Sequence, residues 1–317
     1  LSRLQTTKEK NLTKKDIASG KIDIIIGTHS LLSKDIVYKD LKLLIIDEEH
    51  KFGVTAKEKI KKIKSNIDVL TLTATPIPRT LNSALSQIKD LSIIETPPQN
   101  RKSIVTRIID WDKEIISEAI MREINRGGQV YYVHNKIDTM AIEAKKILCI
   151  NPNINIGIVH GQLEPKIIED EMNKFLNKEY DLIICTSIIE SGLDIQNVNT
   201  IIINNCNNFG LSQLHQIRGR VGRTNRQAYA YLIKSEKSII TKDAEKRLQA
   251  IDSVNSLGGG LELATHDLEI RGAGEILGEE QSGQIYEIGY AMFTDMLNKS
   301  VEILKTGSSP DSEKIVE

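Results

Sequence analysis

The sequence predicts an α/β protein built on mainly parallel sheets. Short runs of β-branched and other apolar residues alternate with longer polar segments of helical periodicity, and this alternation is typical of βαβ units. The runs are apolar on both faces, as strands buried inside a parallel sheet are. They cover Ile22–Ile26, Leu41–Asp47, Val69–Leu72, Gln129–Val133, Ile154–Val159, Leu182–Cys185 and Thr200–Ile203.

Polar side chains collect at the points where these runs end. In open α/β sheets, ligands bind at the carboxyl ends of the strands, so this placement is the one expected of a functional site. The residues concerned are Asp47, Thr73, His134, His160, Thr186 and Asn204.

A proline-rich segment divides the chain into two α/β parts. Pro97 and Pro98 cannot join a central strand or a helix interior, and polar residues follow them. We therefore expect a first part over residues 1–96, a linker over residues 97–103 and a second part over residues 104–235.

Strand-like runs disappear after the second part. Residues 243–257 have helical character, and Gly258–Gly260 favours a sharp reversal before a second helix over residues 261–271. We expect a helical hairpin with a glycine-rich loop over residues 236–305, followed by a frayed polar tail at 306–317.

Composition limits the classes of function. The 317-residue chain has a net formal charge of −1, so any nucleic-acid contact must come from local basic faces. Aromatic residues make up only 4%, which favours contact with a phosphate backbone over stacking of bases on aromatic platforms.

The cysteines indicate the redox state of the compartment, and the first residue indicates whether the sequence is part of a longer protein. Cys149, Cys185 and Cys206 are widely spaced and are expected to be free thiols in a reducing compartment, the cytoplasm. The histidines and cysteines show no metal-ligand spacing, so we expect no metal other than transient Mg²⁺. No apolar run approaches the ~18 residues of a membrane span. Because the chain begins with Leu1, we expect it to be part of a longer polypeptide.

The acidic segment Asp47-Glu48-Glu49-His50 follows an apolar run. A buried strand would carry two carboxylates to its carboxyl tip. Asp47 is suited to hold Mg²⁺ through water, because Mg²⁺ keeps part of its hydration shell. Glu48 is suited to orient and deprotonate an attacking water. The segment therefore indicates phosphoryl-transfer chemistry rather than a solvated turn.

The segment Thr73-Ala74-Thr75 follows the next apolar run. Small hydroxyl residues fit a tight crossing beneath a cleft and can relay hydrogen bonds between two lobes. Its position some 25 residues after the acidic segment favours this function over a plain turn bounded by proline.

An arginine-rich segment, Gln216–Arg223, carries Arg218, Arg220 and Arg223 together with two glycines. A helix bearing these residues has poor propensity, which argues against a purely structural use. Guanidinium groups neutralise charge that builds on a transferred phosphoryl group. The sequence thus predicts that this segment supplies cations to a nucleoside triphosphate whose Mg²⁺ and water are held by the acidic segment.

Weaker signals leave two interpretations open. Gly27-Thr28-His29 and Thr186–Asp194 fit either phosphate contacts or ordinary turns between strands and helices. His134-Asn135 and His160-Gly161 fit either structural histidines or contacts with a phosphate backbone.

The sequence lacks one part that such a site requires. The phosphate-binding pattern G-x-x-x-x-G-K-[ST] occurs nowhere, and Gly258–Gly260 is not followed by Lys and Ser or Thr. We expect this loop to lie in a preceding part of the first lobe, and we expect the 317-residue chain alone to hydrolyse ATP negligibly.

These motifs resemble the motor of superfamily 2 helicases, and more narrowly its double-stranded DNA translocases. The acidic segment with Lys51–Val54, residues 73–80 and Phe209–Arg223 are similar to two families. One is the bacterial transcription-repair coupling factor and the other is the branch-migrating, fork-reversing helicase. Glu49 in the acidic segment favours the first family, as do the segments Gly127–Asn135 and Asp267–Gly283.

The resemblance implies a fold of two RecA-like lobes with parallel sheets, the first truncated at its N-terminus, followed by a helical-hairpin translocation motif. It implies catalytic roles for Asp47, Glu48, Arg220 and Arg223, with Mg²⁺ at Asp47. It implies ATP contacts at Glu49, His50, Gly192, Asp194 and Gln216. It implies coupling of lobe closure to DNA stepping at Thr73, Thr75, Arg247, Arg271 and Gln281. It implies DNA contacts at Thr28, His29, Arg79, Asn135, His160, Gly161 and Thr186.

The resemblance also implies ATP and Mg²⁺ as cofactors and double-stranded DNA as partner, with no membrane. RNA polymerase and an excision-repair protein would bind through modules outside this chain. Two alternatives stay open: a fork-reversing helicase, and a DNA-binding fragment without enzyme activity. A Rossmann-type enzyme would need G-x-G-x-x-G after an early strand, and this pattern is missing. The long segment after the second part disfavours an RNA helicase.

Overall fold

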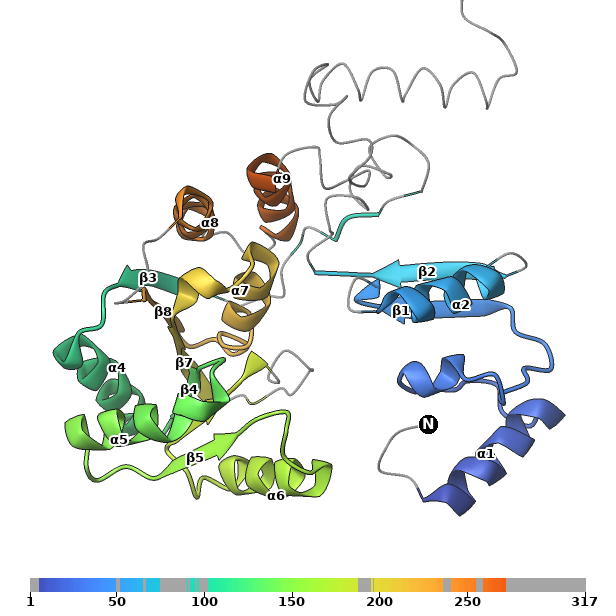
Figure 1. The fold of residues 1–317 in the computed structure, drawn as a ribbon, viewed down its shortest axis with the longest axis horizontal. Coiled ribbons are helices and arrows are strands. Elements are labelled where there is room, and N and C mark those ends of the chain that lie inside the picture. The colour runs from blue at the N-terminus through green and yellow to red at the C-terminus, as the bar shows by residue number, and fades with distance from the viewer. Residues whose placement is uncertain are drawn as a thin grey trace, which may run out of the picture. The chain divides into compact units, whose positions relative to one another are not determined.

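The computed structural model describes residues 6–49, 52–64, 67–74, 90, 92–94, 96, 102–187, 195, 197–235, 241–254 and 259–271. The chain forms two compact units, residues 1–74 and residues 75–317 (Figure 1). No helix in these described ranges is long and apolar enough to cross a membrane.

The first unit contains a small parallel sheet. Strand β1 (Leu43–Asp47) pairs in parallel with β2 (Asp68–Leu72), and the register sets Asp47 opposite Leu72. Helix α2 (Val54–Lys64) connects the two strands, which makes the βαβ unit that the alternation predicts. The ends of the two strands, and the motifs that follow them, therefore lie side by side.

The first unit begins with helix α1 (Thr7–Ser19), and both ends of this helix have typical capping residues. Thr6 and Glu9 form a reciprocal capping box at the N-terminus, and Gly20 closes the C-terminus with a φ of 74°. The short 3₁₀ helix η1 (His29–Leu32) follows.

The predicted strand Ile22–Ile26 is wrong, because these residues form no strand. Ile24 and Ile26 are 83% and 85% exposed, whereas Ile22 and Ile25 pack against Ile17. A strand needs a neighbour to pair with, and no described strand lies beside this segment, so β propensity alone does not decide its conformation.

The second unit is built on a six-stranded sheet with the order β3-β8-β7-β4-β6-β5, in which every pairing is parallel. The strands are β3 (Val105–Ile109), β4 (Gln129–Val133), β5 (Ile156–Val159), β6 (Leu182–Cys185), β7 (Val198–Asn204) and β8 (Tyr229–Ile233). The central strands β4, β6 and β7 are buried along their whole length, as the continuous apolar runs predict.

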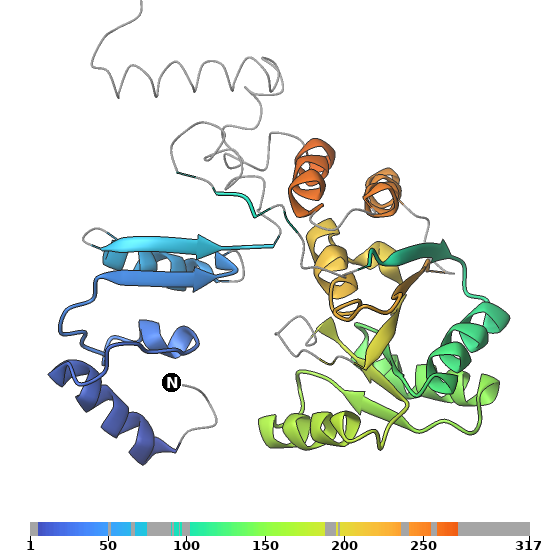
Figure 2. The same cartoon turned by 180° about the vertical axis from the view of Figure 1, so that it is seen from behind.

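Helices cover both faces of this sheet, which Figure 2 shows from behind. One face packs an apolar core against α4 (Lys113–Asn125) and α5 (Met140–Ile150). The other face packs a core against α6 (Pro165–Leu176) and α7 (Leu211–Arg218). The expected α/β class with parallel sheets is therefore confirmed.

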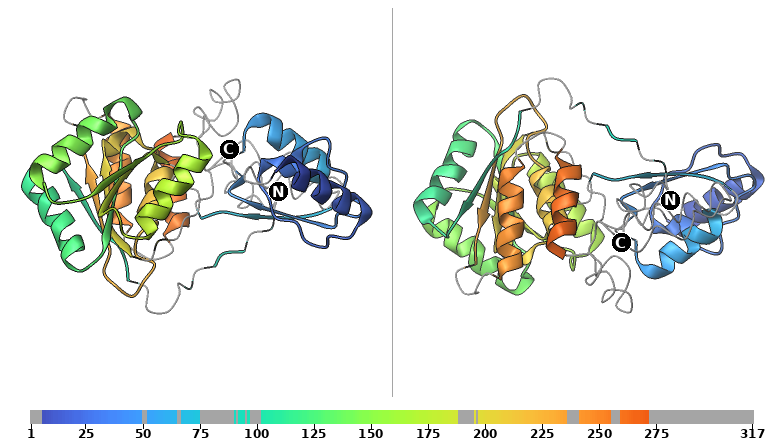
Figure 3. Two further views of the ribbon diagram at one scale, coloured as in Figure 1. Left: turned by 90° about the horizontal axis from the view of Figure 1, so that it is seen from below. Right: turned by 90° about the horizontal axis from the view of Figure 1, so that it is seen from above.

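Two further helices follow the sheet of the second unit. They are α8 (Lys242–Ser253) and α9 (Gly260–Arg271), and they lie side by side against α7 (Figure 3). Leu248, Ile251 and Leu263 from these helices join the same core as α7. Two short 3₁₀ helices, η3 (Ile137–Thr139) and η5 (Cys206–Asn208), complete the unit.

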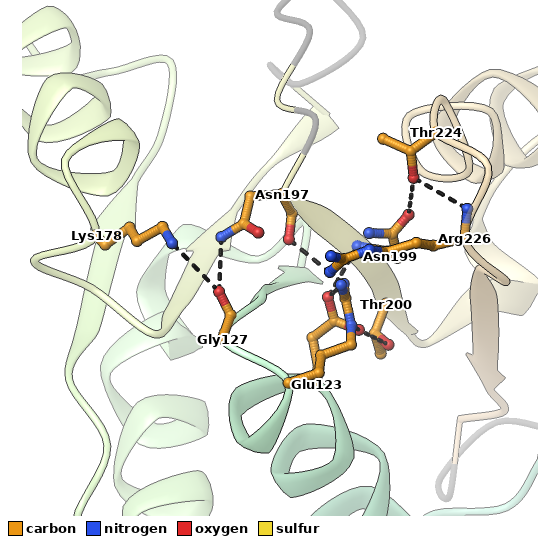
Figure 4. Close-up of polar contacts among 9 residues, drawn as sticks. Glu123, Gly127, Lys178, Asn197, Asn199, Thr200, Thr224 and Arg226 are labelled. Atoms are coloured by element: carbon orange, nitrogen blue, oxygen red, sulfur yellow. Dashed lines mark hydrogen bonds and ion pairs between the residues drawn. The ribbon is translucent and has the colours of Figure 1, made fainter.

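A polar cluster fastens the amino ends of the central strands. Glu123 on α4 is 2% exposed, and its carboxylate accepts hydrogen bonds from Asn199 N (3.0 Å) and Thr200 Oγ1 (2.9 Å) at the start of β7 (Figure 4). Arg126 Nε donates to the same carboxylate at 2.9 Å. Because the buried charge is paired and hydrogen-bonded, the cluster fits a structural role, at the sheet edge opposite the predicted site.

Candidate nucleotide and nucleic-acid sites

Glu48 stands directly after β1 in an unusual backbone conformation. Its φ is 52°, in the left-handed region that non-glycine residues rarely adopt. Its backbone N–H donates to Leu72 O at 2.9 Å, so the end of the neighbouring strand holds it in place. This conformation could not be predicted from the residue types, because contacts with the neighbouring strand define it.

The Glu48 carboxylate joins the acidic segment to the Thr73-Ala74 segment. Its Oε2 accepts a hydrogen bond from Thr73 Oγ1 at 3.2 Å, and its Oε1 accepts one from Ala74 N at 3.1 Å. Both carboxylate oxygens are thus oriented by one neighbouring turn. Asp47, the last residue of β1, is exposed beside it. The structure therefore brings together two of the predicted motifs of the first unit.

A third predicted motif of the first unit lies near the acidic segment. The His29 ring lies 4.3 Å from the Phe52 ring, measured between centroids, and Phe52 follows the acidic segment in the sequence. Thr28 Oγ1 and Ser30 Oγ share a hydrogen bond of 3.3 Å. Both Thr28 and His29 are exposed, as contact with a ligand requires.

Three predicted DNA-contact positions of the second unit follow neighbouring strands. Asn135 follows β4, Thr186 follows β6, and His160 with Gly161 follows β5. The sheet order β4-β6-β5 and its parallel pairings set these strand ends at one edge. Asn135 and Gly161 are exposed there, and His160 and Thr186 are half-buried. The predicted gathering of polar residues at the carboxyl edge is therefore present.

The arginine segment is helical only over its first residues. Helix α7 ends at Arg218, so Arg220 and Arg223 lie in the turns that follow it. Gly219 caps the helix, and Gly222 has a φ of 73°, a conformation strained for any residue with a side chain. The glycines thus end the helix, and they leave Arg220 and Arg223 half-buried on a turn, while Gln216 is buried on α7.

Arg218 is a residue whose role the sequence did not reveal. Its side chain is buried, and Nη1 donates to Ile251 O and Val254 O, both at 2.9 Å, at the C-terminus of α8. A cation at a helix C-terminus satisfies the last carbonyl groups and the helix dipole. Arg218 therefore fastens the arginine segment to α8.

Arg247 makes a second connection between the same elements. Its Nη1 donates to Phe209 O at 3.1 Å, and Phe209 precedes α7. Its Nε donates to Asp243 O at 3.3 Å within α8. The predicted coupling residue Arg247 thus joins α8 to the segment that leads into α7.

The histidine directly before the arginine segment has a shifted pKa. Burial, together with the nearby Arg218 guanidinium, lowers the pKa of His215 to about 4. His215 is therefore neutral near pH 7 and adds no charge to the segment.

Several predicted residues lie outside the described residues: His50, Thr75, Arg79, Gly192, Asp194 and Gln281. Arg271 ends α9, and its side chain is also outside the described part of the chain. Glu49 is half-buried beside Glu48.

The described residues fit a nucleotide with Mg²⁺ at the first unit. An exposed carboxylate on Asp47 suits Mg²⁺, which takes one or two carboxylates and keeps several waters. No group of three or more His, Cys, Asp or Glu residues in the described ranges is arranged to hold a metal ion.

Comparison with family models identifies two domains. Residues 1–84 match the DEAD/DEAH box helicase family, and residues 111–225 match the helicase conserved C-terminal domain. These are the two RecA-like domains that the resemblance implies, and they give the chain two domains of the helicase type.

Comparison with curated proteins identifies more specific relatives. The chain is 51% identical over 317 residues to a transcription-repair-coupling factor of Haemophilus influenzae, with 100% of this chain and 28% of that protein covered. It is 54% identical over 314 residues to that of Buchnera aphidicola, with 99% and 39% covered. The resemblance to transcription-repair-coupling factors is thereby confirmed over the whole chain, which spans well under half the length of these relatives.

Solved structures agree with the fold. A structure of RecG bound to a three-way DNA junction matches with a TM-score of 0.64 at 31% identity, covering 91% of this chain and 39% of that chain. The Mycobacterium smegmatis helicase Lhr, bound to single-stranded DNA and AMP-PNP, matches with a TM-score of 0.57 at 14% identity, covering 80% and 36%. The second likeness supports the fold alone.

Proposed function

We propose that this chain is the motor section of an ATP-dependent, double-stranded DNA translocase of the transcription-repair-coupling kind. The observation that carries the proposal is Glu48, held with φ of 52° and with its carboxylate oriented by Thr73 and Ala74. A strained, oriented carboxylate at a strand end suits a general base better than a surface turn. The relatives named above support the choice of reaction.

ATP and Mg²⁺ are the proposed cofactors, and Mg²⁺ would supply charge neutralisation at the phosphates. Asp47 holds the metal, and Glu48 takes the proton of the attacking water. Arg220 and Arg223 neutralise charge on the transferred phosphoryl group. Glu49, His50, Gly192, Asp194 and Gln216 are proposed to bind the nucleotide.

The domain division accompanies this proposal. Residues 1–96 form part of the first lobe, residues 104–235 form the second lobe, and residues 236–305 form the translocation motif. A linker at 97–103 and a tail at 306–317 complete the chain. Thr73, Thr75, Arg247, Arg271 and Gln281 are proposed to couple nucleotide state to DNA movement.

Double-stranded DNA is the proposed partner, bound through its phosphates. Thr28, His29, Arg79, Asn135, His160, Gly161 and Thr186 are proposed to contact it. Such contacts make binding independent of sequence and dependent on salt. RNA polymerase and an excision-repair protein are proposed partners of a full-length protein that contains this segment, in a cytoplasmic setting.

The test is ATP hydrolysis by such a full-length protein with linear duplexes of unrelated sequence. We expect every duplex to stimulate turnover equally, and we expect the stimulation to fall as salt rises. Turnover that duplex DNA does not stimulate would overturn the proposal.

A second candidate is a fork-reversing helicase, because the structure of RecG on a three-way junction resembles this chain. Strong preference of the full-length protein for branched DNA over linear duplex would favour it. Duplex binding by the 317-residue chain without any ATP-dependent activity of the full-length protein would favour the remaining alternative, a DNA-binding fragment.

A further inference from the structure

His134 connects three elements at the carboxyl edge of the large sheet. It follows β4 and is 3% exposed. Its backbone N–H donates to Cys185 O, at the end of β6, at 2.8 Å. Its ring lies between Asn204, the last residue of β7, and Thr139 at the end of η3. The residue thus joins the ends of β4, β6 and β7 to the turn that follows β4.

The hydrogen bonds of the ring define one tautomer. Asn204 Nδ2 lies 3.1 Å from His134 Nδ1, and an amide nitrogen only donates, so Nδ1 accepts. His134 Nε2 lies 2.7 Å from Thr139 Oγ1. Thr139 Oγ1 donates its own proton to Lys136 O at 3.1 Å, so it accepts from Nε2–H. In this arrangement Nε2 carries the only ring proton and Nδ1 carries none, so the imidazole is neutral.

The charged surroundings agree with a neutral ring. Burial lowers the pKa of His134, and the positive charges of Lys136 and Lys146 act in the same direction. Glu143 on α5 acts in the opposite direction, but its carboxylate is already paired with Lys146 at 2.9 Å and with Tyr132 Oη at 3.0 Å.

The joined elements are the ones that carry proposed DNA contacts. Asn135 follows His134 directly, and Thr186 follows Cys185. Asn204 is followed by Asn205, which has a φ of 53° and turns the chain into η5. After η5 comes Phe209, whose carbonyl accepts the hydrogen bond from Arg247. A rotation of the His134 ring would break its hydrogen bonds to Thr139 and Asn204 and so loosen the turn after β4 and the end of β7. The backbone bond from His134 to Cys185 connects that turn to the end of β6.

We propose that His134 is a positioning residue whose Nε2–H tautomer fixes the Asn135 and Thr186 turns for contact with a nucleic-acid phosphate backbone. This inference rests on the proposed DNA binding. An apolar side chain could fill the same space, but it would leave Asn204 and Thr139 without their partner and the turns without orientation.

The matched variants are Thr139→Val and Thr139→Ser. Valine keeps the shape of threonine and removes the hydroxyl group, whereas serine keeps the hydroxyl group. The probe is a fluorescently labelled linear duplex, titrated with the 317-residue chain. Thr139→Val removes the hydrogen bond to His134 Nε2 and the one to Lys136 O, and the exposed Lys136 carbonyl can bond water instead. A net loss of ~1 kcal/mol predicts duplex binding about 5-fold weaker for Thr139→Val, and serine should leave it near that of the unaltered chain.

Two further measurements separate positioning from stability. Long-range ¹H–¹⁵N NMR of the imidazole, assigned with His134→Gln, should show the Nε2–H tautomer in the unaltered chain and in Thr139→Ser. Amide hydrogen exchange at Asn135 and Thr186 should quicken in Thr139→Val while exchange in the core strands stays unchanged.

Equal duplex binding by both Thr139 variants, or an Nδ1–H tautomer in the unaltered chain, would overturn the inference. If the unaltered chain does not bind duplex DNA, the proposed DNA contact fails, and amide exchange then decides whether His134 positions these turns. Exchange that is equal in both variants would overturn the positioning role.

Discussion

Glu48 occupies a backbone region that costs free energy for a residue with a β-carbon. Among the described residues, Glu48, Lys178 and Asn205 are the non-glycine residues with positive φ. Such a conformation costs about 1–3 kcal/mol and persists where surrounding structure enforces it. At Glu48 the enforcing contacts are those to Leu72, Thr73 and Ala74. The strain therefore serves to aim a carboxylate.

The first prediction concerns Glu48→Gln in a full-length protein that contains this chain. Glutamine keeps the size and the hydrogen-bond acceptor but cannot take a proton, so nucleotide binding should persist while turnover falls about 100-fold or more. Binding is measured by titration with a fluorescent nucleotide, and turnover by phosphate release. Glu58→Gln, an exposed change on α2, is the control. Unchanged turnover in Glu48→Gln would refute the assignment of the base.

The second prediction concerns acid stability at His215. Its pKa is about 4 in the folded chain, against 6.5 for a free histidine, so the unfolded chain binds the proton more readily. Stability is therefore complete above pH 6.5 and declines as pH falls toward 4. The decline should reach about 3 kcal/mol at its limit.

Urea unfolding of the chain at a series of pH values checks this expectation. His215→Gln should flatten the dependence of the unfolding free energy on pH between these limits. A residual slope should remain from His134, whose pKa burial also lowers. Identical slopes with and without His215 would contradict the prediction.

At the scale of elements, helices α7 and α8 are joined by two arginines, one on each helix, and each arginine donates hydrogen bonds to the other element or to the segment that precedes it. Arg218 reaches from α7 to the carbonyl groups at the end of α8, and Arg247 reaches from α8 to Phe209 before α7. The two helices therefore move as one body with the arginine segment.

The third prediction tests this attachment with Arg218→Met. Methionine fills much of the apolar space but leaves Ile251 O and Val254 O without a donor, which should cost about 3 kcal/mol of unfolding free energy. Amide exchange in α8 should quicken first. Arg226→Met, at an exposed position, is the control and should leave both measurements unchanged. Equal stability of the two variants would show that Arg218 does not fasten α8.

The two-stranded sheet of the first unit has one apolar face exposed. Leu43, Ile45, Leu70 and Leu72 alternate with residues that face α2, and each is exposed. Contiguous exposed apolar residues mark a surface that another molecule or segment covers. The same alternation buries Ile46 on the other side of the sheet, and Ile60 of α2 is buried as well.

The fourth prediction is that the 317-residue chain binds the dye anilinonaphthalene sulfonate through this face. The double change Ile45→Thr and Leu70→Thr should reduce dye fluorescence, because threonine keeps β propensity but removes apolar area. Leu12→Thr, at an isolated exposed position on α1, is the control. Undiminished fluorescence in the double variant would place the dye elsewhere.

Strands can be predicted from the sequence where a buried strand also contains a continuous run of apolar residues. The fully buried strands β4, β6 and β7 contain runs of apolar residues and were identifiable. Strands β3 and β8 were missed, and β3 mixes Thr106 and Arg107 into its apolar pattern. The arginine segment was expected to be a poor helix former, and helix α7 stops at Arg218, before Gly219 and Gly222. Close contact of a side chain at Gly222 with Ile104 and Ala228 could not be foreseen from the sequence.

The contact of Glu48 with Thr73 was foreseeable in outline, because both follow neighbouring parallel strands. The partners of His134 and Arg218 were not foreseeable. The side chain of His134 bonds to groups 5 to 70 residues away. The side chain of Arg218 bonds to groups 33 to 112 residues away. Sequence spacing within one element carries no information about such pairs.

At the scale of the whole molecule, the family matches divide the chain into a DEAD/DEAH box part and a helicase C-terminal part, with α8 and α9 after them. The proposed base lies in the first part and the proposed arginines in the second. The proposed function also includes movement along DNA, which would need a further element that responds to nucleotide chemistry.

Helix α9 is placed to be this element. It contacts both α7 and α8, and α7 carries Arg218 at the start of the arginine segment. Arg271 is its last residue. A displacement of the arginine segment would therefore pass through α8 to α9 by direct packing and by the hydrogen bonds of Arg218 and Arg247.

The fifth prediction is that Arg271→Ala in a full-length protein separates hydrolysis from movement. The substitution lies at the far end of this path from the proposed catalytic residues, so duplex-stimulated ATP hydrolysis should persist. Displacement of a triplex-forming strand from duplex DNA, which reports movement along the duplex, should be lost. Arg226→Ala, an exposed change in the second part, should retain both activities. If hydrolysis and displacement fell in parallel in Arg271→Ala, Arg271 would act on nucleotide chemistry, and the coupling role of α9 would be wrong.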